Sequence, residues 1–365
     1  MKKYIGIMSG TSLDGVDVAL VETDGRTISL LASIESEMPE SIKSDVLSIC
    51  LGQTTNLKQV GELDHRLGHL YADAVLQLLE ANQIAASDVE AIGCHGQTVF
   101  HQPQGPYPFT MQLGDANIIA ARTGIQVVAD FRRKDMAFGG QGAPLVPAFH
   151  DALFSDTVTA KIIVNIGGIA NVSVLLPQQS PFGYDTGPGN MLMDAWCMRH
   201  LNQPFDRQGQ WAASGTVDQD LLATLLADPY LAQLPPKSTG REHYHLDWLD
   251  TQLAKHASIA AQDVQATLLW FTARSIADAV LQHRATALYV CGGGANNPLL
   301  MQALQQLLPD CDVATTSSKG VDSDFMEAMA FAWLAHQRLH YLPGNMAKVT
   351  GASQNCVLGC VYASH

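Results

Sequence analysis

The sequence has little positive charge. Its 365 residues include 21 Lys and Arg against 35 Asp and Glu, which gives a formal net charge of -14. A protein of this charge repels polyanions and anionic membrane surfaces at long range. We therefore expect small molecules as ligands, with no nucleic-acid and no membrane partner. A small anion would have to be held by local groups, such as backbone N–H groups, helix N-termini, a bound cation or a few arginines.

The sequence also lacks paired cysteines and long apolar runs. Its seven cysteines are an odd set without a C-x-x-C motif, which is typical of reduced thiols in a cytosolic protein. No apolar run approaches the ~18 residues that indicate a membrane span. The apolar stretch near the N-terminus stops at Ser9 and Gly10, so it is too short for the core of a signal peptide. These absences predict a cytoplasmic protein.

Two common nucleotide-binding motifs are missing as well. The glycine turn at residues 10–15 lacks the Gly-Lys-Ser/Thr end of a P-loop, and residues 183–190 lack the G-x-G-x-x-G spacing of dinucleotide-binding folds. A nucleotide would therefore have to be held by a different kind of glycine turn.

What is present is an alternation of strand-like and helix-like segments, typical of an α/β protein. Apolar strands at 4–8, 16–23 and 27–33 predict a meander. Leucine and alanine recur at helical spacing over 60–82, which predicts an amphipathic helix. We also expect helices near 40–50, 115–123 and 323–338, and strands at 89–94 and 126–129.

One pattern occurs twice in the chain. An apolar strand, a glycine turn and a second apolar strand fill residues 5–21 and again residues 162–174. This similarity predicts a duplicated α/β unit, and the chain length predicts two domains. A later strand at 287–291 leads through three glycines into a helix, a pattern that brings the backbone close to a ligand at a helix N-terminus.

The first glycine turn carries groups that suit phosphate. The hydroxyls of Thr11 and Ser12 can donate to phosphate oxygens, and Asp14 can hold Mg²⁺ directly or through water. The same residues could also be an ordinary hairpin turn. The repeated glycines Gly167 and Gly168 favour phosphate binding.

A fixed carboxylate is predicted at Asp185. This residue stands among turn-forming residues, just before a helix that we expect to begin near Met191. A carboxylate held in this way suits a general base that takes a proton from water or a hydroxyl. The alternative is an aspartate that only accepts hydrogen bonds from turn amides.

Polar side chains follow two other predicted strands. His95, Gln97 and Thr98 follow one, and Arg133 follows the other. Ligands bind at strand ends in such sheets, where polar groups suit sugar hydroxyls and an arginine suits a carboxylate. His95 could equally be a packed histidine, and the basic residues around Arg133 could be solvated. Glu327, on the helix at 323–338, has small neighbours that would let it approach a ligand, but spacing alone leaves its role undecided.

Four motifs resemble one protein family, in the same order along essentially the whole chain. They are residues 8–17 (MSGTSLDGVD), 94–98 (CHGQT), 185–190 (DTGPGN) and 291–298 (CGGGANNP). The two glycine hairpins and the duplicated halves resemble the ATPase fold shared by acetate and sugar kinases, actin and the heat-shock ATPases. The motifs themselves look like those of the anhydro-N-acetylmuramic acid kinases.

The resemblance implies duplicated actin-like ATPase (ribonuclease H-like) domains around a central cleft. The first lobe would be 1–130 plus about 341–365, and the second 131–340. It also implies a homodimer and a kinase that uses ATP, Mg²⁺ and water to convert 1,6-anhydro-N-acetylmuramic acid, a cell-wall fragment, into N-acetylmuramic acid 6-phosphate.

The residue roles that this resemblance implies are as follows. Asp185 would be the general base that activates the attacking water, with Glu327 beside that water. Asp14 would bind the metal, and His95, Gln97, Thr98 and Arg133 would contact the sugar and its lactyl group. The ATP contacts would be Gly10, Thr11, Ser12, Leu13, Asp14, Gly15, Val16, Asp17, Gly167, Gly168, Gly292, Gly293, Gly294 and Asn296.

Two alternatives remain open on the residues alone. The first is a kinase of the same fold that phosphorylates another sugar or a small carboxylate, with Asp185 deprotonating the acceptor hydroxyl directly. Product analysis in ¹⁸O-labelled water separates the two reactions, because only ring opening by water puts the label on C1. The second is a nucleotide-switched chaperone or filament protein, which would hydrolyse ATP without forming a sugar phosphate.

Overall fold

The chain forms two compact units. The computed structural model describes residues 1–365 except 11–12, 14, 180, 236 and 241–242. The first unit comprises Met1–Leu153 and Phe325–His365, and the second comprises Phe154–Asp324. The sequence-based boundaries, 130/131 and 340/341, differ from these. Residues 131–153 and 325–340 belong to the first unit. Residues 325–340 do so because the helix at Met326–Leu339 packs on its sheet.

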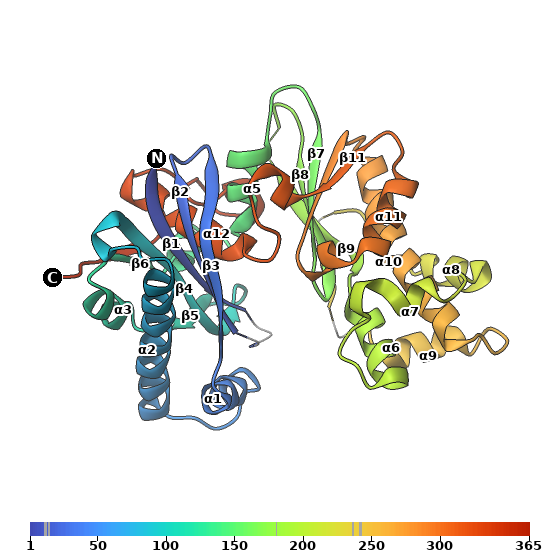
Figure 1. The fold of residues 1–365 in the computed structure, drawn as a ribbon, viewed down its shortest axis with the longest axis horizontal. Helices are drawn as coiled ribbons and strands as arrows, with labels where there is room; N and C mark the ends of the chain where they lie inside the picture. Colours follow the sequence, from blue (N-terminus) through green and yellow to red (C-terminus); the bar gives the residue numbers. More distant parts are fainter. Residues whose placement is uncertain (11–12, 14, 180, 236, 241–242) are drawn as a thin grey trace. The chain divides into compact units, whose positions relative to one another are not determined.

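The first unit is built on a sheet of strand order β12-β6-β4-β1-β2-β3, with β5 paired to β4. The strands β1, β2 and β3 form an antiparallel meander, and β4 and β6 continue the sheet in parallel with β1 (Figure 1). Its elements are β1 (Lys2–Ser9), β2 (Gly15–Thr23), β3 (Ile28–Glu37), α1 (Glu40–Cys50), α2 (Leu57–Ala81), β4 (Val89–Gln102), β5 (Phe109–Leu113), α3 (Ala116–Thr123), β6 (Val127–Ala129), α4 (Arg133–Ala137), α5 (Val146–Phe154), α12 (Met326–Leu339), α13 (Ala347–Thr350) and β12 (Cys360–Tyr362).

Helices cover both faces of this sheet. The helix α2 begins with a capping box between Asn56 and Gln59, and its apolar stripe packs on β1 side chains such as Ile5 and Ile7. Successive residues of a strand point to opposite faces, so Gly6 faces the other side. There α12 lies so close that a Cβ on Gly6 would collide with the backbone of α12. The missing side chain lets the helix approach the strand.

The second unit repeats the strand order of the first. Its sheet runs β11-β10-β7-β8-β9, with an antiparallel meander β7-β8-β9 and with β10 and β11 parallel to β7. In both units the third, second and first strands of the meander lie side by side in that order. Two further strands, parallel to the first, complete the series. The predicted α/β class and the duplication are confirmed. The elements are β7 (Lys161–Ile166), β8 (Ile169–Leu175), β9 (Phe182–Pro188), α6 (Met191–Leu201), α7 (Gln210–Ala213), α8 (Gln219–Leu226), α9 (Leu246–Leu253), α10 (Ala261–Gln282), β10 (Ala287–Cys291), the 3-10 turn η3 (Gly293–Asn296), α11 (Pro298–Leu307) and β11 (Asp312–Thr315).

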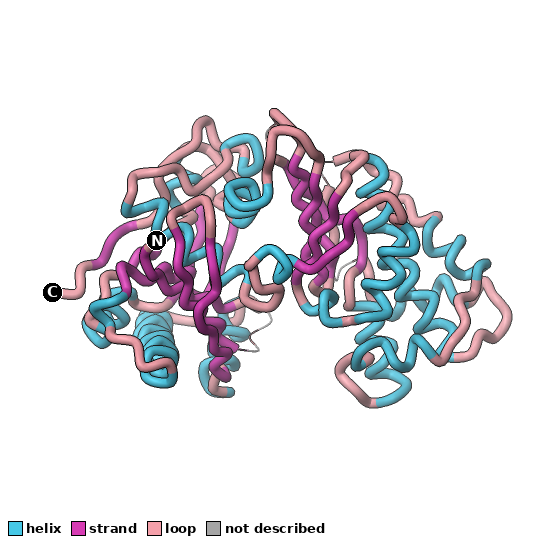
Figure 2. The backbone as a smooth tube through the Cα atoms, turned by 45° about the horizontal axis from the view of Figure 1, so that its top comes forward, coloured by secondary structure: helices cyan, strands magenta, loops and turns pink. Residues whose placement is uncertain are grey.

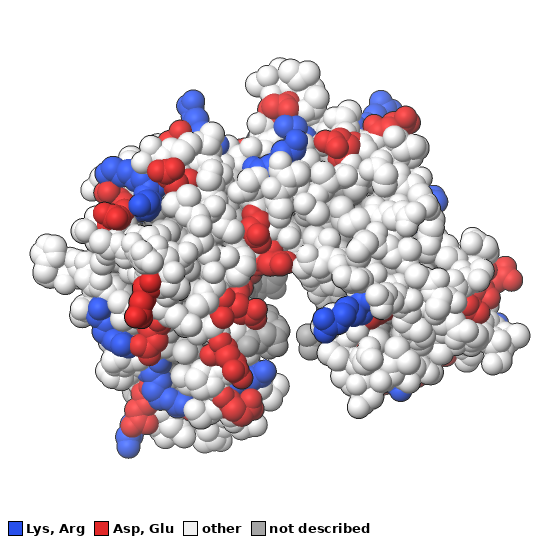
Figure 3. Space-filling model, viewed as in Figure 1, with Lys and Arg blue, Asp and Glu red and all other residues white. Residues whose placement is uncertain are grey.

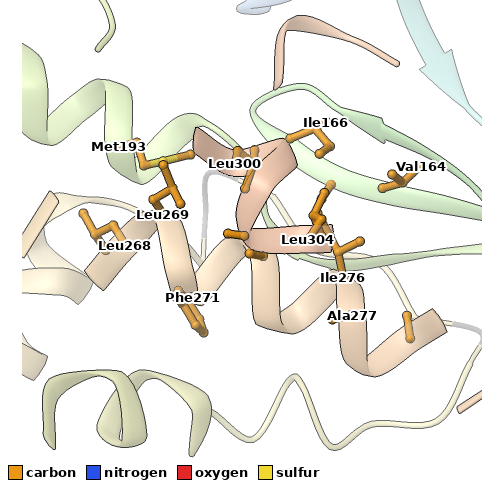
Figure 4. Packing of buried hydrophobic residues seen from close by; sticks show 14 of the residues in the cluster. Val164, Ile166, Met193, Leu268, Leu269, Phe271, Ile276, Ala277, Leu300 and Leu304 are labelled. Atoms are coloured by element: carbon orange, nitrogen blue, oxygen red, sulfur yellow. The ribbon is translucent and has the colours of Figure 1, made fainter. Parts of the chain in front are cut away.

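The core of the second unit lies between its sheet and the helices α6, α10 and α11. Figure 4 shows Val164 and Ile166 of β7 near Ile276 of α10 and near Leu300 and Leu304 of α11, and all five are buried in one cluster. In Figure 2 the strands of each unit appear with helical segments packed beside them. The sheet of each unit therefore has a rigid apolar support beneath the loops that end its strands.

The surface carries mixed charge. On the face shown in Figure 3, Lys and Arg side chains are scattered among Asp and Glu side chains on both units. Within the part of the chain that the structure describes, none of the helices is both long and apolar enough to span a bilayer.

Candidate functional site

The second glycine turn is held against the start of α6. The carbonyl of Gly167 accepts a hydrogen bond of 2.8 Å from the N–H of Asn190, and the carbonyl of Gly168 accepts bonds of 2.9 and 3.2 Å from the N–H groups of Gly189 and Met191. The turn between β7 and β8 is therefore fixed to the residues that begin the helix after β9.

Three glycines of this region have no structural need to be glycine. An added Cβ at Gly167, Gly168 or Gly293 would find its nearest neighbour 3.8, 3.7 and 3.7 Å away, which is ordinary contact, and none of them has a left-handed φ. The atom that a Cβ on Gly293 would meet is Nδ2 of Asn190, so Asn190 joins the two segments. Since the fold would tolerate a side chain at each position, these glycines leave open backbone that a ligand can approach.

The neighbouring glycines are different, because the fold requires them. Gly292 has φ +76°, and a Cβ there would meet Asn165 and Ile166. A Cβ on Gly294 would collide with Ile166. These two glycines allow the backbone to pass from β10 through η3 to α11. The predicted strand, glycine turn and helix are present, and the predicted contact of these glycines with a ligand stays a prediction.

Side chains hold the end of η3 and the start of α11. Asn297 accepts hydrogen bonds from the N–H groups of Leu299 and Leu300 and so caps α11. Asn296, the last residue of η3, donates to Asp324 at 2.9 Å, which holds it next to the glycines of the same turn.

Asp185 lies in β9, three residues before the strand ends, rather than at the strand-to-helix junction predicted from the sequence. Its Oδ2 accepts 2.9 and 3.0 Å hydrogen bonds from the hydroxyl of Ser238 and the N–H of Thr239. The hydroxyl of Tyr230 donates to its backbone carbonyl at 2.8 Å. Burial lowers the pKa of the adjacent Lys237, and the negative charge of Asp185 opposes that shift. The carboxylate is thus oriented by several groups, as a base must be.

In the first unit, His95 and Arg132 form a buried pair. Nε and Nη2 of Arg132 lie 3.0 and 2.8 Å from Nε2 of His95. His95 is 5% exposed, and its ring lies 4.7 Å from that of Phe331. Burial, and then the positive charge of Arg132, hold the pKa of His95 well below its usual value. His95 is therefore neutral, and its Nε2 accepts from the guanidinium.

Arg132 is in turn held by a buried aspartate network. Nη1 of Arg132 donates to the carbonyl of Gly142 at 2.9 Å, and the N–H of Gly142 donates to Asp135 at 2.8 Å. Asp135 is fully buried and also accepts 2.6 Å hydrogen bonds from Asn345 and Thr350. Through Gly142, this network fixes the Nη1 end of the Arg132 guanidinium.

Glu327 is electrostatically coupled to Arg132. It lies in the first turn of α12, and the residue as a whole is exposed. Loss of solvent around its carboxyl group raises the pKa of Glu327, and the charge of Arg132 opposes the rise. Burial likewise lowers the pKa of Arg132, while the charge of Glu327 opposes that shift. Arg132 is therefore linked to His95 by hydrogen bonds and to Glu327 by charge, and we refer to the three as the His95–Arg132–Glu327 cluster.

His95, Gln97 and Thr98 all lie inside β4, so the prediction that they follow a strand is wrong. Residues 97–102 continue the strand because β5 pairs with them, a contact that local sequence does not show. Gln97 is buried, accepts a 2.6 Å hydrogen bond from Ser9, and donates to the carbonyl of Gly10 at 3.4 Å. Thr98 accepts a 3.1 Å hydrogen bond from Gln112. Gln97 is thus fixed to the first glycine turn.

The first glycine turn is described only in part. Thr11, Ser12 and Asp14 lie outside the described residues, and with them the predicted metal ligand. The side chains of Leu13 and Val16 are buried in the core, so only their backbone could face a ligand. Across the described residues no group of three or more His, Cys, Asp or Glu side chains is arranged to hold a metal ion.

The structure pairs Arg133 with Asp130. Its Nε and Nη2 lie 2.7 Å from Oδ1 and Oδ2 of that carboxylate. The arginine that reaches His95 is Arg132, which sequence reasoning missed. The two arginines are adjacent in the sequence and of the same type, so the sequence alone does not show which one turns inward.

Comparison with known proteins agrees with the motifs. The sequence profile of the family described as "Anhydro-N-acetylmuramic acid kinase" matches residues 2–364. A protein of that name from Vibrio parahaemolyticus is 59% identical over 99% of this chain and 98% of its own length. Its namesake from Aliivibrio fischeri is 57% identical over 100% of both chains. The chain therefore belongs to the anhydro-N-acetylmuramic acid kinase family.

Proposed function

We propose that this protein phosphorylates 1,6-anhydro-N-acetylmuramic acid with ATP. Water opens the 1,6-anhydro ring in the same reaction, and the products are N-acetylmuramic acid 6-phosphate and ADP, in the recycling of cell-wall peptidoglycan. The observation that carries the proposal is membership of the kinase family over essentially the whole chain, at 57–59% identity to relatives that bear its name.

ATP would be held by backbone groups of the glycine segments. The uncrowded Gly167, Gly168 and Gly293 support this assignment, because the phosphates could approach the backbone there without meeting a side chain. The N–H of Gly167 already donates to the carbonyl of Ile169 at 3.2 Å, so we assign the N–H contacts to Gly168 and Gly293. We assign the rest of the nucleotide contacts to the first glycine turn and to Gly292, Gly294 and Asn296. Mg²⁺ would neutralise charge on the phosphates during transfer, and we propose Asp14 as its ligand.

Asp185 would act as the general base. Its carboxylate would take a proton from the water that attacks the anomeric carbon C1. The bond between C1 and O6, the oxygen of the 1,6-anhydro bridge, breaks. O6 takes the γ-phosphoryl group, so that the charge of the departing oxygen passes to phosphate. The hydrogen bonds from Ser238 and Thr239 support this role, because they hold the carboxylate in one orientation.

His95, Gln97, Thr98 and Glu327 remain our candidates for the sugar and the attacking water. To these we add Arg132, whose contact with His95 and coupling to Glu327 support a role in binding the lactyl carboxylate. Arg133, which the structure pairs with Asp130, is the alternative candidate for this contact. We also propose that the protein is a cytoplasmic homodimer. The absence of a disulfide among the cysteines of the described residues supports the compartment.

The test is Asp185→Asn, which keeps the shape of the side chain and removes the base. We expect kcat to fall by about 10³-fold, within the range for loss of a general base. The control is Asp250→Asn on α9, where an exposed aspartate pairs with Arg199, and we expect it to retain full activity. A near-normal rate of sugar phosphate formation by Asp185→Asn would show that the assignment of the base is wrong.

The substrate is tested separately with the unaltered protein in ¹⁸O-labelled water. The proposal requires label on C1 of the phosphorylated product. Phosphate transfer without label at C1 would point to a different acceptor, whatever the result with Asp185→Asn.

A further inference from the structure

A hollow in the first unit lies apart from the His95–Arg132–Glu327 cluster. It is formed by α4, by the end of α12 and by the segment that leads into β12, and its volume is about 650 Å³. Pockets of this size are typical of small-molecule sites. Arg133, Lys134, Arg338, Tyr341 and Val357 are among its lining residues. We call it the α4 pocket.

The α4 pocket is positive in a strongly negative chain. It is lined by three cationic side chains and one carboxylate, Asp130. That carboxylate pairs with Arg133 through both of its oxygens, so these two charges cancel. No ion pair involves Lys134 or Arg338 among the residues that the structure describes, so two positive charges remain for a ligand.

Arg338 is already oriented. Its Nε donates a 2.9 Å hydrogen bond to the carbonyl of Gly359, and its guanidinium lies 5.4 Å from the centre of the Tyr341 ring. A guanidinium fixed by one donor still offers its terminal N–H groups, and fixing it in advance reduces the entropy lost on binding. Paired donors of this kind suit phosphate oxygens.

The other walls are apolar. Tyr341, Val357 and Ala137 line the α4 pocket together with the cations. A bare phosphate ion would fill only a fraction of about 650 Å³. The occupant that matches both the charge and the volume has a phosphate group and an organic body.

We propose that the α4 pocket binds a small organic phosphate such as a sugar phosphate. Lys134 and Arg338 bind the phosphate, and the organic body lies against Tyr341 and Val357. The binding site does not depend on the proposed reaction, because none of these four residues has a role in it.

The experiment measures binding of glucose 6-phosphate to the full chain by calorimetry, beside glucose and inorganic phosphate. Lys134→Gln removes one unpaired cation, and we expect affinity to fall about tenfold, as for loss of a charge-assisted hydrogen bond. Arg26→Gln is the matched control, because Arg26 is an exposed cation of the same unit that does not line the pocket. It should leave the affinity unchanged.

Asp130→Asn gives a test in the opposite direction. It removes the one negative charge of the pocket, and asparagine tolerates the left-handed φ of this position. We expect affinity for glucose 6-phosphate to rise about threefold to tenfold, since Arg133 then becomes a third unpaired cation.

Two results would overturn the proposal. One is unchanged affinity for glucose 6-phosphate in both Lys134→Gln and Asp130→Asn. The other is that glucose or inorganic phosphate binds as tightly as glucose 6-phosphate. The pocket would then not require a ligand that has both a phosphate group and an organic body. Arg338→Gln also loses the contact with Gly359, so if its melting temperature falls, the other two variants decide.

Discussion

The two units share one strand order but differ at the centre of the sheet. Gly6 lies four residues before Gly10 on β1, and its partner on β4 is Gly93. The matching position of the second unit, four residues before Gly167 on β7, is Ile163, and its partner on β10 is Tyr289. Two glycines in one sheet thus correspond to two large side chains in the other.

What packs on each sheet explains this difference. In the first unit, a Cβ on Gly93 would collide with the carbonyl oxygen of Phe331, because α12 crosses the strands at that point. In the second unit, the ring of Tyr289 packs 5.7 Å from that of Phe154. The topology of the strands therefore does not fix the size of their central residues. Their size depends on how closely the element that covers the sheet approaches the strands.

Gly93→Ala is the most direct test of whether α12 requires glycine at the centre of the first sheet. We expect a loss of about 3 kcal/mol or more in the free energy of unfolding of the first unit, because the added methyl meets backbone that cannot move aside. Urea denaturation followed by hydrogen exchange in β1 and β4 measures it. The control is Gly61→Ala on α2, where a Cβ meets nothing within 4 Å, and it should stabilise the helix by about 0.5–1 kcal/mol. Equal effects of the two substitutions would contradict close packing of α12.

Arg132→Gln and Arg133→Gln separate the structural from the sequence-based assignment within the first unit. We expect Arg132→Gln to lower kcat/KM for the sugar about 100-fold, since it removes both the donor to His95 and a charge-assisted contact. Arg133→Gln loses an exposed ion pair and should change kcat/KM less than threefold. Steady-state kinetics with varied sugar distinguishes them, and the reverse ranking would restore Arg133 as the sugar contact.

Asp194→Asn tests a feature of the second unit, on α6. Burial, and then the charge of Asp206, raise the pKa of Asp194 to about 7. The folded protein therefore holds a proton that the unfolded chain releases near pH 4, so stability falls as pH rises between these values. The variant should gain about 1–2 kcal/mol relative to the parent between pH 5 and pH 8, after allowance for partial exposure. Hydrogen exchange of α6 at the two pH values checks this, and a pH-independent difference would refute the shift.

Much of the fold could be predicted because it depends on local sequence patterns. The two strand–turn–strand repeats, the stripe of α2 and the glycines before α11 all depend on residues close together in the chain. The sheet on which α12 packs could not be predicted, because the apolar residues of this helix would suit either sheet. The continuation of β4 past His95 depends on β5, which is also a non-local contact.

Part of the placement of the candidate residues could also be predicted. The repeated glycine turns follow from turn chemistry, whereas Asp185, expected at the junction before a helix, lies within β9. The sequence could not show which of Arg132 and Arg133 reaches His95, because the two are adjacent residues of the same type. The grouping of Arg132 with Glu327 required the position of α12. That Gly167, Gly168 and Gly293 are uncrowded could be known only from the atoms around them.

The position of α12 also sets an order of events during synthesis. The ribosome makes the second unit, residues 154–324, before the helix that completes the first. Until residue 339 has emerged, α12 cannot cover the glycine face of β1 and β4, although both strands are made before the second unit. The second unit can therefore fold while the chain is still growing, and the unit that starts first finishes last.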